Sequence, residues 1–156
     1  AFINRQALID IGGELDIETN WCADFDLWLR IGLNHSIKYI PEVISTYRHH
    51  QDQRNSNIEY LTIRNPKCKR YALDKLYDRN DLPSSILKVK RRSYANLFLI
   101  QAIQNAKIDN NDIALKNVFE VMKIFPLSFA SKRGYYLLRL LFRNLINLLW
   151  SSANNT

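Results

Sequence analysis

Two aspartates one residue apart, Asp24 and Asp26, are the first groups in this sequence whose types and spacing suit chemistry. They open a run that starts with carboxylates, continues apolar and reaches Arg30 near a glycine. An ionised carboxylate can act as a general base and take a proton from a hydroxyl group. The ordinary explanation is that acidic residues favour the first turn of a helix, where the helix dipole stabilises them. These residues alone leave both explanations open.

A second polar group is the run Tyr47-Arg48-His49-His50. A guanidinium can donate two hydrogen bonds to phosphate oxygens, and a neutral imidazole can bind a divalent ion. Taken without context, the run is also typical of a solvated, basic strand end. We therefore consider it together with the elements that precede it.

The first part of the chain reads as mixed helix and strand. Residues 4–11 are predicted to form a short helix that ends at Gly12, a suitable residue for a left-handed C-cap. A second helix is expected from about residue 22 to 33. Residues 37–40 and 43–49 are rich in β-formers, so they are predicted to be strands on either side of a proline.

From about residue 58 onward the strand signal is lost and helical periodicity takes over. Four helices are expected, near residues 67–78, 85–106, 112–124 and 129–150. The middle two are predicted to pair as an antiparallel hairpin joined at Asp109. The last has a wide apolar face interrupted by one polar stripe of Arg139, Arg143 and Asn147. It is too short to span a bilayer, so we expect it to pack over the hairpin, with a membrane-surface helix as the alternative.

Charge divides the chain in a similar way. Residues 1–61 carry a net charge of −4, residues 62–92 carry +7 and residues 93–156 carry +4. A nucleic-acid module with one positive face does not have this distribution, so no nucleic-acid partner is expected. Two cysteines and three histidines are too few for a disulfide framework or a Cys/His zinc module.

Four blocks of the first third follow one another in a specific order: residues 2–13, 24–30, 39–43 and 47–50, with Ser56 after them. Together they resemble the second half of a family 2 glycosyltransferase domain. The resemblance implies the C-terminal half of an α/β, Rossmann-like GT-A domain over residues 1–58, followed by an all-α extension over residues 59–156. The chain starts at Ala1 without an initiator Met, so we expect a fragment that lacks the first catalytic half.

The resemblance also implies an activity and a site. The activity is transfer of a sugar, with inversion, from a nucleotide-diphosphate sugar donor to a hydroxyl of a carbohydrate or lipid-linked acceptor. Asp24 takes the role of general base, although Ala23 stands where the family usually has Glu. His50 is the implied ligand of a divalent metal, Mg or Mn, whose other ligands belong mostly to the missing half. The residues expected to bind substrate are Gly12, Gly13, Trp21, Asp26 and Arg48, with Asp26 also suited to capping or support.

The alternative is a helical docking or peripheral membrane-association module, in which the α/β part is degenerate and non-catalytic. The basic stretch of residues 67–92 would assist binding to anionic lipid. Both hypotheses predict a cytoplasmic location, and the second adds peripheral contact with the inner face of the membrane.

Overall fold

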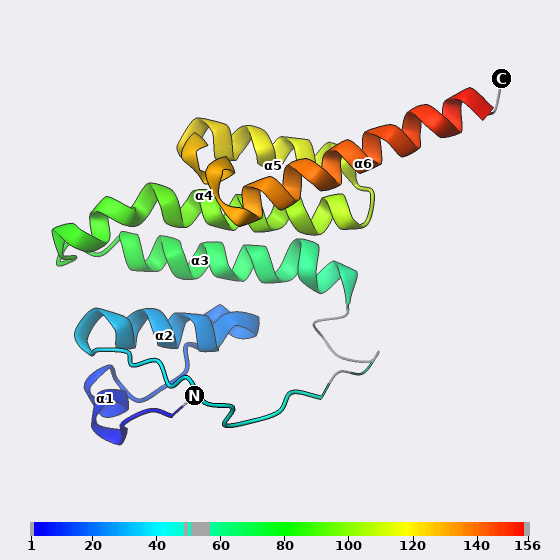
Figure 1. The fold of residues 1–156 in the computed structure, drawn as a ribbon. Helices are drawn as coiled ribbons and strands as arrows, with labels where there is room; N and C mark the ends of the chain where they lie inside the picture. Colours follow the sequence, from blue (N-terminus) through cyan, green and yellow to red (C-terminus); the bar gives the residue numbers. More distant parts are fainter. Residues whose placement is uncertain (1, 49, 51–56, 155–156) are drawn as a thin grey trace. The chain divides into compact units, whose positions relative to one another are not determined.

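The computed structural model describes residues 2–48, 50 and 57–154, except for the side chains at 20, 21, 149 and 151–154. Figure 1 shows the elements in chain order: α1 (Arg5–Asp10), the 3-10 turn η1 (Ile17–Cys22), α2 (Ala23–Asn34), the π-helical turn η3 (Tyr60–Arg64), α3 (Asn65–Tyr77), α4 (Ser84–Lys107), α5 (Asn111–Ile124), the 3-10 turn η4 (Pro126–Ala130) and α6 (Lys132–Asn154). The chain divides into two compact units, Ala1–Arg79 and Asn80–Thr156. The domain division expected at 58/59 stays a prediction.

No β-strand occurs among the described residues, so the α/β fold class is wrong. Residues 36–48 form irregular chain where strands 37–40 and 43–49 were expected. A strand is stable only when its backbone pairs with a neighbour, and Pro41-Glu42 lacks the positive-φ residues that close a two-residue hairpin. The interpretation as a Rossmann-like GT-A half, and with it the resemblance to family 2 glycosyltransferases, is therefore wrong.

Helix α1 is bounded by strong local signals. The Asn4 side chain accepts a hydrogen bond from the backbone N–H of Gln6 at 2.8 Å, which caps the first turn. Gly12 and Gly13 have φ values of +93° and +69°. Their N–H groups donate to the carbonyls of Ile9 and Leu8 respectively, the two bonds of a Schellman motif. The predicted left-handed cap at Gly12 is confirmed.

The first unit is held together by α2 packing on α3. Leu27 and Ile31 of α2 are buried, as are Ala72, Leu73 and Leu76 of α3. The turn η3 leads directly into α3. Pro66 lies in the first turn of α3, where a missing backbone N–H is tolerated. Helices α2 and α3 match the helices predicted at 22–33 and 67–78 to within a few residues.

In the second unit, α4 and α5 form the predicted antiparallel hairpin. Asp109 adopts a positive φ of +58° in the connection, a conformation that aspartate tolerates better than most residues. The buried residues of α4 recur every three or four positions, and three of the four are alanine: Ala95, Leu99, Ala102 and Ala106. Because alanine side chains are small, they allow the neighbouring helices to approach α4 closely. Phe119 of α5, by contrast, is 60% exposed.

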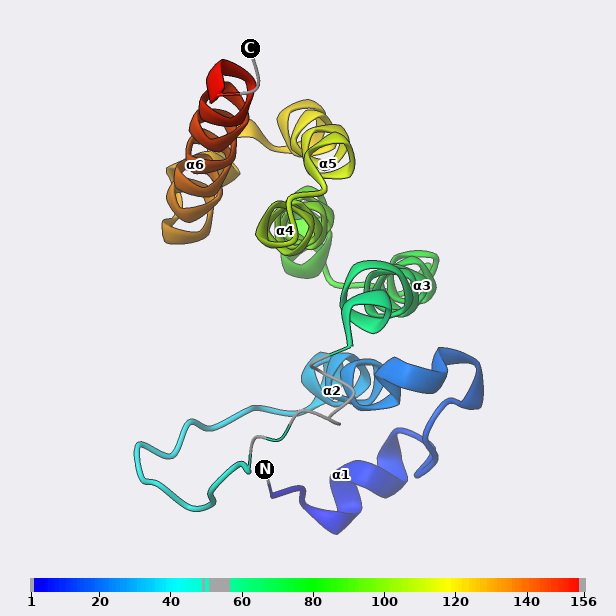
Figure 2. The same ribbon diagram turned by 90° about the vertical axis from the view of Figure 1, so that its right-hand side faces the viewer.

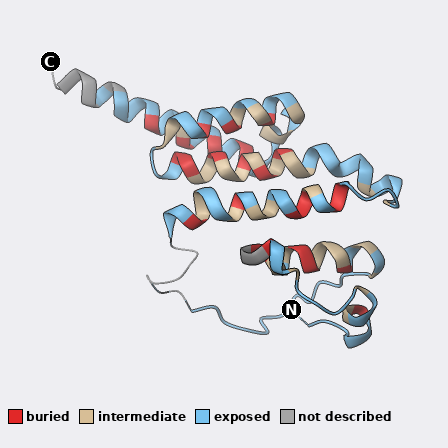
Figure 3. Cartoon of the chain, turned by 180° about the vertical axis from the view of Figure 1, so that it is seen from behind, coloured by how far each residue is buried: buried red, intermediate tan, exposed pale blue. Residues whose placement is uncertain are grey.

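Helix α6 packs on α4, as the sequence predicted for the last helix. Leu137, Leu140 and Asn144 are buried on its packing face. Figure 2 views α4 and α5 nearly end-on, with α6 running obliquely beside them. Figure 3 shows buried residues along α4 and the first half of α6, while the second half of α6 is largely exposed. None of the described helices combines the length and the apolar character that crossing a membrane requires.

Candidate functional site

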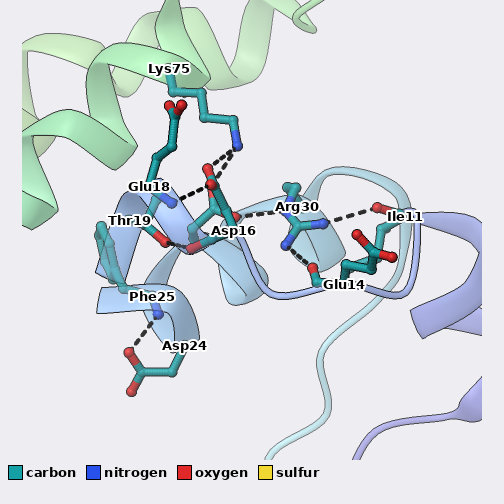
Figure 4. Close-up of polar contacts among 10 residues, drawn as sticks. Ile11, Glu14, Asp16, Glu18, Thr19, Asp24, Phe25, Arg30 and Lys75 are labelled. Atoms are coloured by element: carbon teal, nitrogen blue, oxygen red, sulfur yellow. Dashed lines mark hydrogen bonds and ion pairs between the residues drawn. The ribbon is translucent and has the colours of Figure 1, made fainter. Parts of the chain in front are cut away.

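Asp24 lies exposed in the first turn of α2. Its Oδ1 accepts a hydrogen bond from the backbone N–H of Phe25 at 2.8 Å, and Figure 4 shows its side chain apart from the polar cluster around Arg30. This is the position of a first-turn carboxylate near a helix N-terminus. The general-base role of Asp24 stays a prediction.

Asp26 differs from Asp24 in being buried, with only 3% of the residue exposed. Its Oδ2 accepts from Arg30 Nε at 2.7 Å, one helical turn later. Its Oδ1 lies 3.6 Å from Lys75 Nζ of α3. Asp26 therefore pairs with Arg30 within α2 and links α2 to α3 through Lys75, which is the supporting role that the sequence suggested for it.

Arg30 is a central residue that the sequence analysis did not select. Besides Asp26, it donates from Nη1 to the carbonyl of Ile11 at 2.9 Å and from Nη2 to that of Glu14 at 2.8 Å. These bonds hold the loop that follows the Schellman motif against α2 (Figure 4). The four-residue spacing from Asp26 was a visible signal for the ion pair, but not for the two carbonyl contacts.

The same loop is tied to α3 by two further contacts. Lys75 donates to Asp16, and this bond holds the pKa of the Asp16 carboxyl below its ordinary value of 3.8. Tyr71 donates its hydroxyl to Glu18, which raises the pKa of Tyr71 to about 12. In both cases the contact stabilises the protonation state found at neutral pH.

Cys22 ends η1 and is 1% exposed. Burial, with Cys68 close by, raises the pKa of the Cys22 thiol to about 12, so the thiol is fully protonated at neutral pH. Its Sγ lies 3.6 Å from the carbonyl of Asn65 as a weak donor. Cys22 thus has a structural role in the first unit, and both cysteines are free thiols.

The other predicted site residues are spread over the first unit. Gly12 and Gly13 serve the cap of α1, and their predicted role in substrate binding is untested. Arg48 and His50 are exposed in irregular chain. The side chain of Trp21 lies outside the described part of the structure.

The divalent metal inferred from the resemblance stays a prediction. Among the described residues, no group of three or more His, Cys, Asp and Glu side chains converges on a point that could hold an ion. His50 alone does not make a site, because stable binding requires several ligands. We therefore derive no chemistry through a metal.

The first unit also contains an open groove of about 680 Å³ between α1, α2 and the irregular segment after α2. Its walls are mainly apolar, with Trp28, Ile31 and Ile37 among them. The polar groups include Asp10 and His35, whose Oδ2 and Nε2 lie 3.5 Å apart. Neither Asp24 nor His50 lines this groove, so it does not assemble the predicted catalytic site.

Helix α6 of the second unit has several large apolar side chains that are exposed. Five apolar side chains, each between 47% and 70% exposed, recur at spacings of three and four residues: Tyr135, Leu138, Phe142, Leu145 and Ile146. We call this set the α6 apolar stripe. At 3.6 residues per turn, these side chains occupy the sector of the helix next to the buried face that contains Leu137 and Asn144. Arg139 and Arg143 border it on the other side.

No protein-family model, no curated protein and no solved structure matches this chain. The fold and the surfaces described above are therefore the basis for inferring function.

Proposed function

We propose that this chain is a helical docking module that binds peripherally to an anionic membrane surface through α6. The observation that carries the proposal is the α6 apolar stripe, an exposed row of large side chains along a 23-residue helix. Helices that lie in a membrane interface have an apolar face of this kind, bordered by Lys and Arg. The stripe is unusual for a surface that faces only water.

The length and placement of the stripe suit an in-plane helix. From Tyr135 to Ile146 it covers about three turns of α6. Trp150, which is 71% exposed, extends the row of large apolar side chains toward the C-terminal end. Aromatic rings of this type favour the boundary between headgroups and acyl chains. In Figure 1 this end of α6 extends past α4 and α5, so neither helix of the hairpin covers it.

The charge of the unit supports an anionic surface as the partner. Helix α6 contains four Lys and Arg residues and no Asp or Glu. Residues 80–156 together contain 11 basic and 4 acidic residues. Each cation near an anionic membrane contributes about 1 kcal/mol to binding. Because cytoplasmic leaflets carry the anionic lipids, we propose the inner face of the membrane as the target.

A second copy of the chain fits the stripe less well. Arg139 and Arg143 border the stripe four residues apart. Pairing of two copies through it would bring these arginines close to those of the partner, with no α6 carboxylate to neutralise them. Like charges at such an interface oppose association, whereas anionic headgroups neutralise them.

Sedimentation with lipid vesicles tests the proposal. The full chain should sediment with vesicles of phosphatidylcholine and phosphatidylglycerol, bind weakly to phosphatidylcholine alone, and be released in part by high salt. The double variant Phe142→Ser/Leu145→Ser should lose about 2 kcal/mol of binding, a decrease of roughly 30-fold in the partition constant.

A matched control is available on α5. Phe119 and Met122 are 60% and 53% exposed, close to the values of 65% and 52% for Phe142 and Leu145. The variant Phe119→Ser/Met122→Ser should bind vesicles like the wild type, and circular dichroism should show both variants folded. Equal loss of binding in the two variants would contradict a role specific to α6.

General-base catalysis of sugar transfer by Asp24 is the second candidate function. The observation in its favour is the exposure of this carboxylate at the first turn of α2, which leaves it accessible to an acceptor hydroxyl. The test is hydrolysis or transfer of nucleotide-sugar donors by the chain, with Asp24→Asn as the matched variant. Turnover that is equal in the two proteins, or absent from both, counts against this function for the chain.

A further inference from the structure

A second cavity of the helical unit has a different character from the α6 apolar stripe. It is an open cavity of about 710 Å³ between the first half of α4, η4 and the first turn of α6. Its polar lining consists of Arg92, Ser93 and Asn96 from α4, Ser128 from η4, and Ser131, Lys132 and Arg133 at the start of α6. Its volume is in the range of sites that hold small molecules.

The cavity is positively charged. Three cations line it, and no acidic residue does. Arg133 donates from Nη1 to the amide oxygen of Asn96 at 2.8 Å, so its guanidinium is oriented by a neutral partner that leaves the positive charge in place. Among the described residues, no ion pair links Arg92, Lys132 or Arg133 to a carboxylate.

The corner between η4 and α6 fixes the positions of these groups. Ser131 Oγ accepts from the backbone N–H of Gly134 at 3.1 Å and donates to the carbonyl of Ser128 at 2.6 Å. The helix passes so close to η4 that a methyl group at Gly134 would lie 2.4 Å from Phe129 Cα. On the facing helix, Arg91 Nε donates to the carbonyl of Ile124 at 2.9 Å and ties α4 to the end of α5. The cavity is therefore built from elements held at fixed separations.

The cationic side chains that line the cavity favour a phosphate group as the ligand. Guanidinium and ammonium groups are the usual donors to phosphate oxygens, and the start of a long helix adds a partial positive charge. Val89, Phe125 and Leu127 form apolar walls beside the cations. Such walls favour an organic group attached to the phosphate over the free ion.

We infer that this cavity binds the phosphate of a phosphomonoester, with Arg92, Lys132 and the first turn of α6 as the anion site and the neighbouring apolar walls receiving the organic group. The site uses none of the residues of the α6 apolar stripe, so it does not rest on the proposed membrane function. The phosphomonoester is either a soluble metabolite or the headgroup of a lipid such as phosphatidic acid, and the two sources share this chemistry.

Calorimetric titration of the full chain with phenyl phosphate and with inorganic phosphate, at constant ionic strength set by sodium chloride, tests the inference. Phenyl phosphate should bind saturably and more tightly than inorganic phosphate. Arg92→Gln and Lys132→Gln should each weaken binding by about tenfold. Lys116→Gln on α5, an exposed cation outside the cavity, should leave it unchanged. The absence of saturable binding, or an equal loss in Lys116→Gln, would overturn the inference, provided that circular dichroism shows the variants folded.

Binding measurements with lipid vesicles distinguish a soluble phosphomonoester from a lipid headgroup. If Arg92→Gln and Lys132→Gln reduce binding to phosphatidic acid vesicles more than to phosphatidylglycerol vesicles of equal surface charge, the ligand is a lipid headgroup. If they reduce only the binding of phenyl phosphate, it is a soluble ester. Either result supports the anion site. Because the phenyl phosphate titration contains no membrane, its outcome is separate from that of the Phe142→Ser/Leu145→Ser experiment.

Discussion

Asn144 of α6 donates a hydrogen bond from Nδ2 to the backbone carbonyl of Ala106, at 2.8 Å and across 38 positions of sequence. The same nitrogen donates to Oδ1 of Asn111, at 2.9 Å. Ala106 lies in the last turn of α4 and Asn111 begins α5. One amide, only 2% exposed, therefore joins all three helices of the second unit.

Replacement of this amide should destabilise the second unit. Asn144→Ala removes the buried amide that bridges the Ala106 carbonyl and Asn111 Oδ1, so we expect a loss of about 2–3 kcal/mol in the free energy of unfolding. Urea denaturation followed by circular dichroism measures it. Asn147→Ala, three residues later on an exposed position of the same helix, should change stability by less than about 0.5 kcal/mol. Equal midpoints for the two variants would refute the structural role of Asn144.

The two aspartates at the start of α2 should differ in their effect on folding. Asp26→Ala leaves Arg30 and Lys75 without the carboxylate between them, and we expect the first unit to lose about 2–4 kcal/mol. Asp24→Ala removes an exposed first-turn charge and should cost less than about 1 kcal/mol. Thermal or urea denaturation of the two variants, measured side by side, gives the comparison. A larger loss for Asp24→Ala would show that the buried network does not stabilise the unit.

The contact between Lys75 and Asp16 should make the first unit sensitive to acid. The folded pKa of Asp16 lies below its ordinary value of 3.8, so its contribution to stability is complete above that pH and is lost as the pH falls through the folded pKa. Urea midpoints measured between about pH 5 and pH 2.5 should fall less steeply for Asp16→Asn than for the wild type. Glu14→Gln is the control, since the backbone carbonyl of Glu14, not its carboxylate, accepts from Arg30. A slope unchanged in Asp16→Asn would refute the assignment.

The same substitution at two glycines should have opposite effects. An alanine Cβ at Gly134 would lie 2.4 Å from Phe129 Cα, so Gly134→Ala must move η4 away from α6, and we expect a loss of about 2 kcal/mol. At Gly32, inside α2, the nearest atom is the Ile37 side chain at 3.6 Å, an ordinary contact. Gly32→Ala should stabilise the chain by roughly 0.5–1 kcal/mol, because alanine favours the helix. Melting temperatures report both signs, and a stabilised Gly134→Ala variant would be inconsistent with the close approach.

The helices were predictable from the sequence because their signals are local. Helix α4, observed at Ser84–Lys107, was predicted at 85–106 from apolar periodicity and the breakers on either side. The cap at Gly12 needed only the glycine after a short helix. The strands around Pro41 were wrong because a strand depends on a distant partner, which alternation of residue types in one segment cannot supply.

The candidate sites were less accessible to sequence analysis. The spacing of Asp26 and Arg30 indicates an ion pair, but nothing in it points to Lys75, which comes from another helix 49 positions later. The cavity around Arg92 and Lys132 likewise forms only when η4 turns the chain back over α4. The block Asp24–Arg30 suggested a catalytic family, whereas the structure pairs Asp26 with Arg30 within α2.

Asn144 is the last described side chain of α6 that is buried. The helix continues for ten residues beyond it, to Asn154. Most of the stability of a helix in a protein comes from packing of its apolar face, and beyond Asn144 no described side chain of α6 is buried. The stability of this end of the helix therefore depends on the surface that it contacts. Amide exchange in α6 beyond Asn144 should slow on that surface, so protection of this end of the helix would itself report binding.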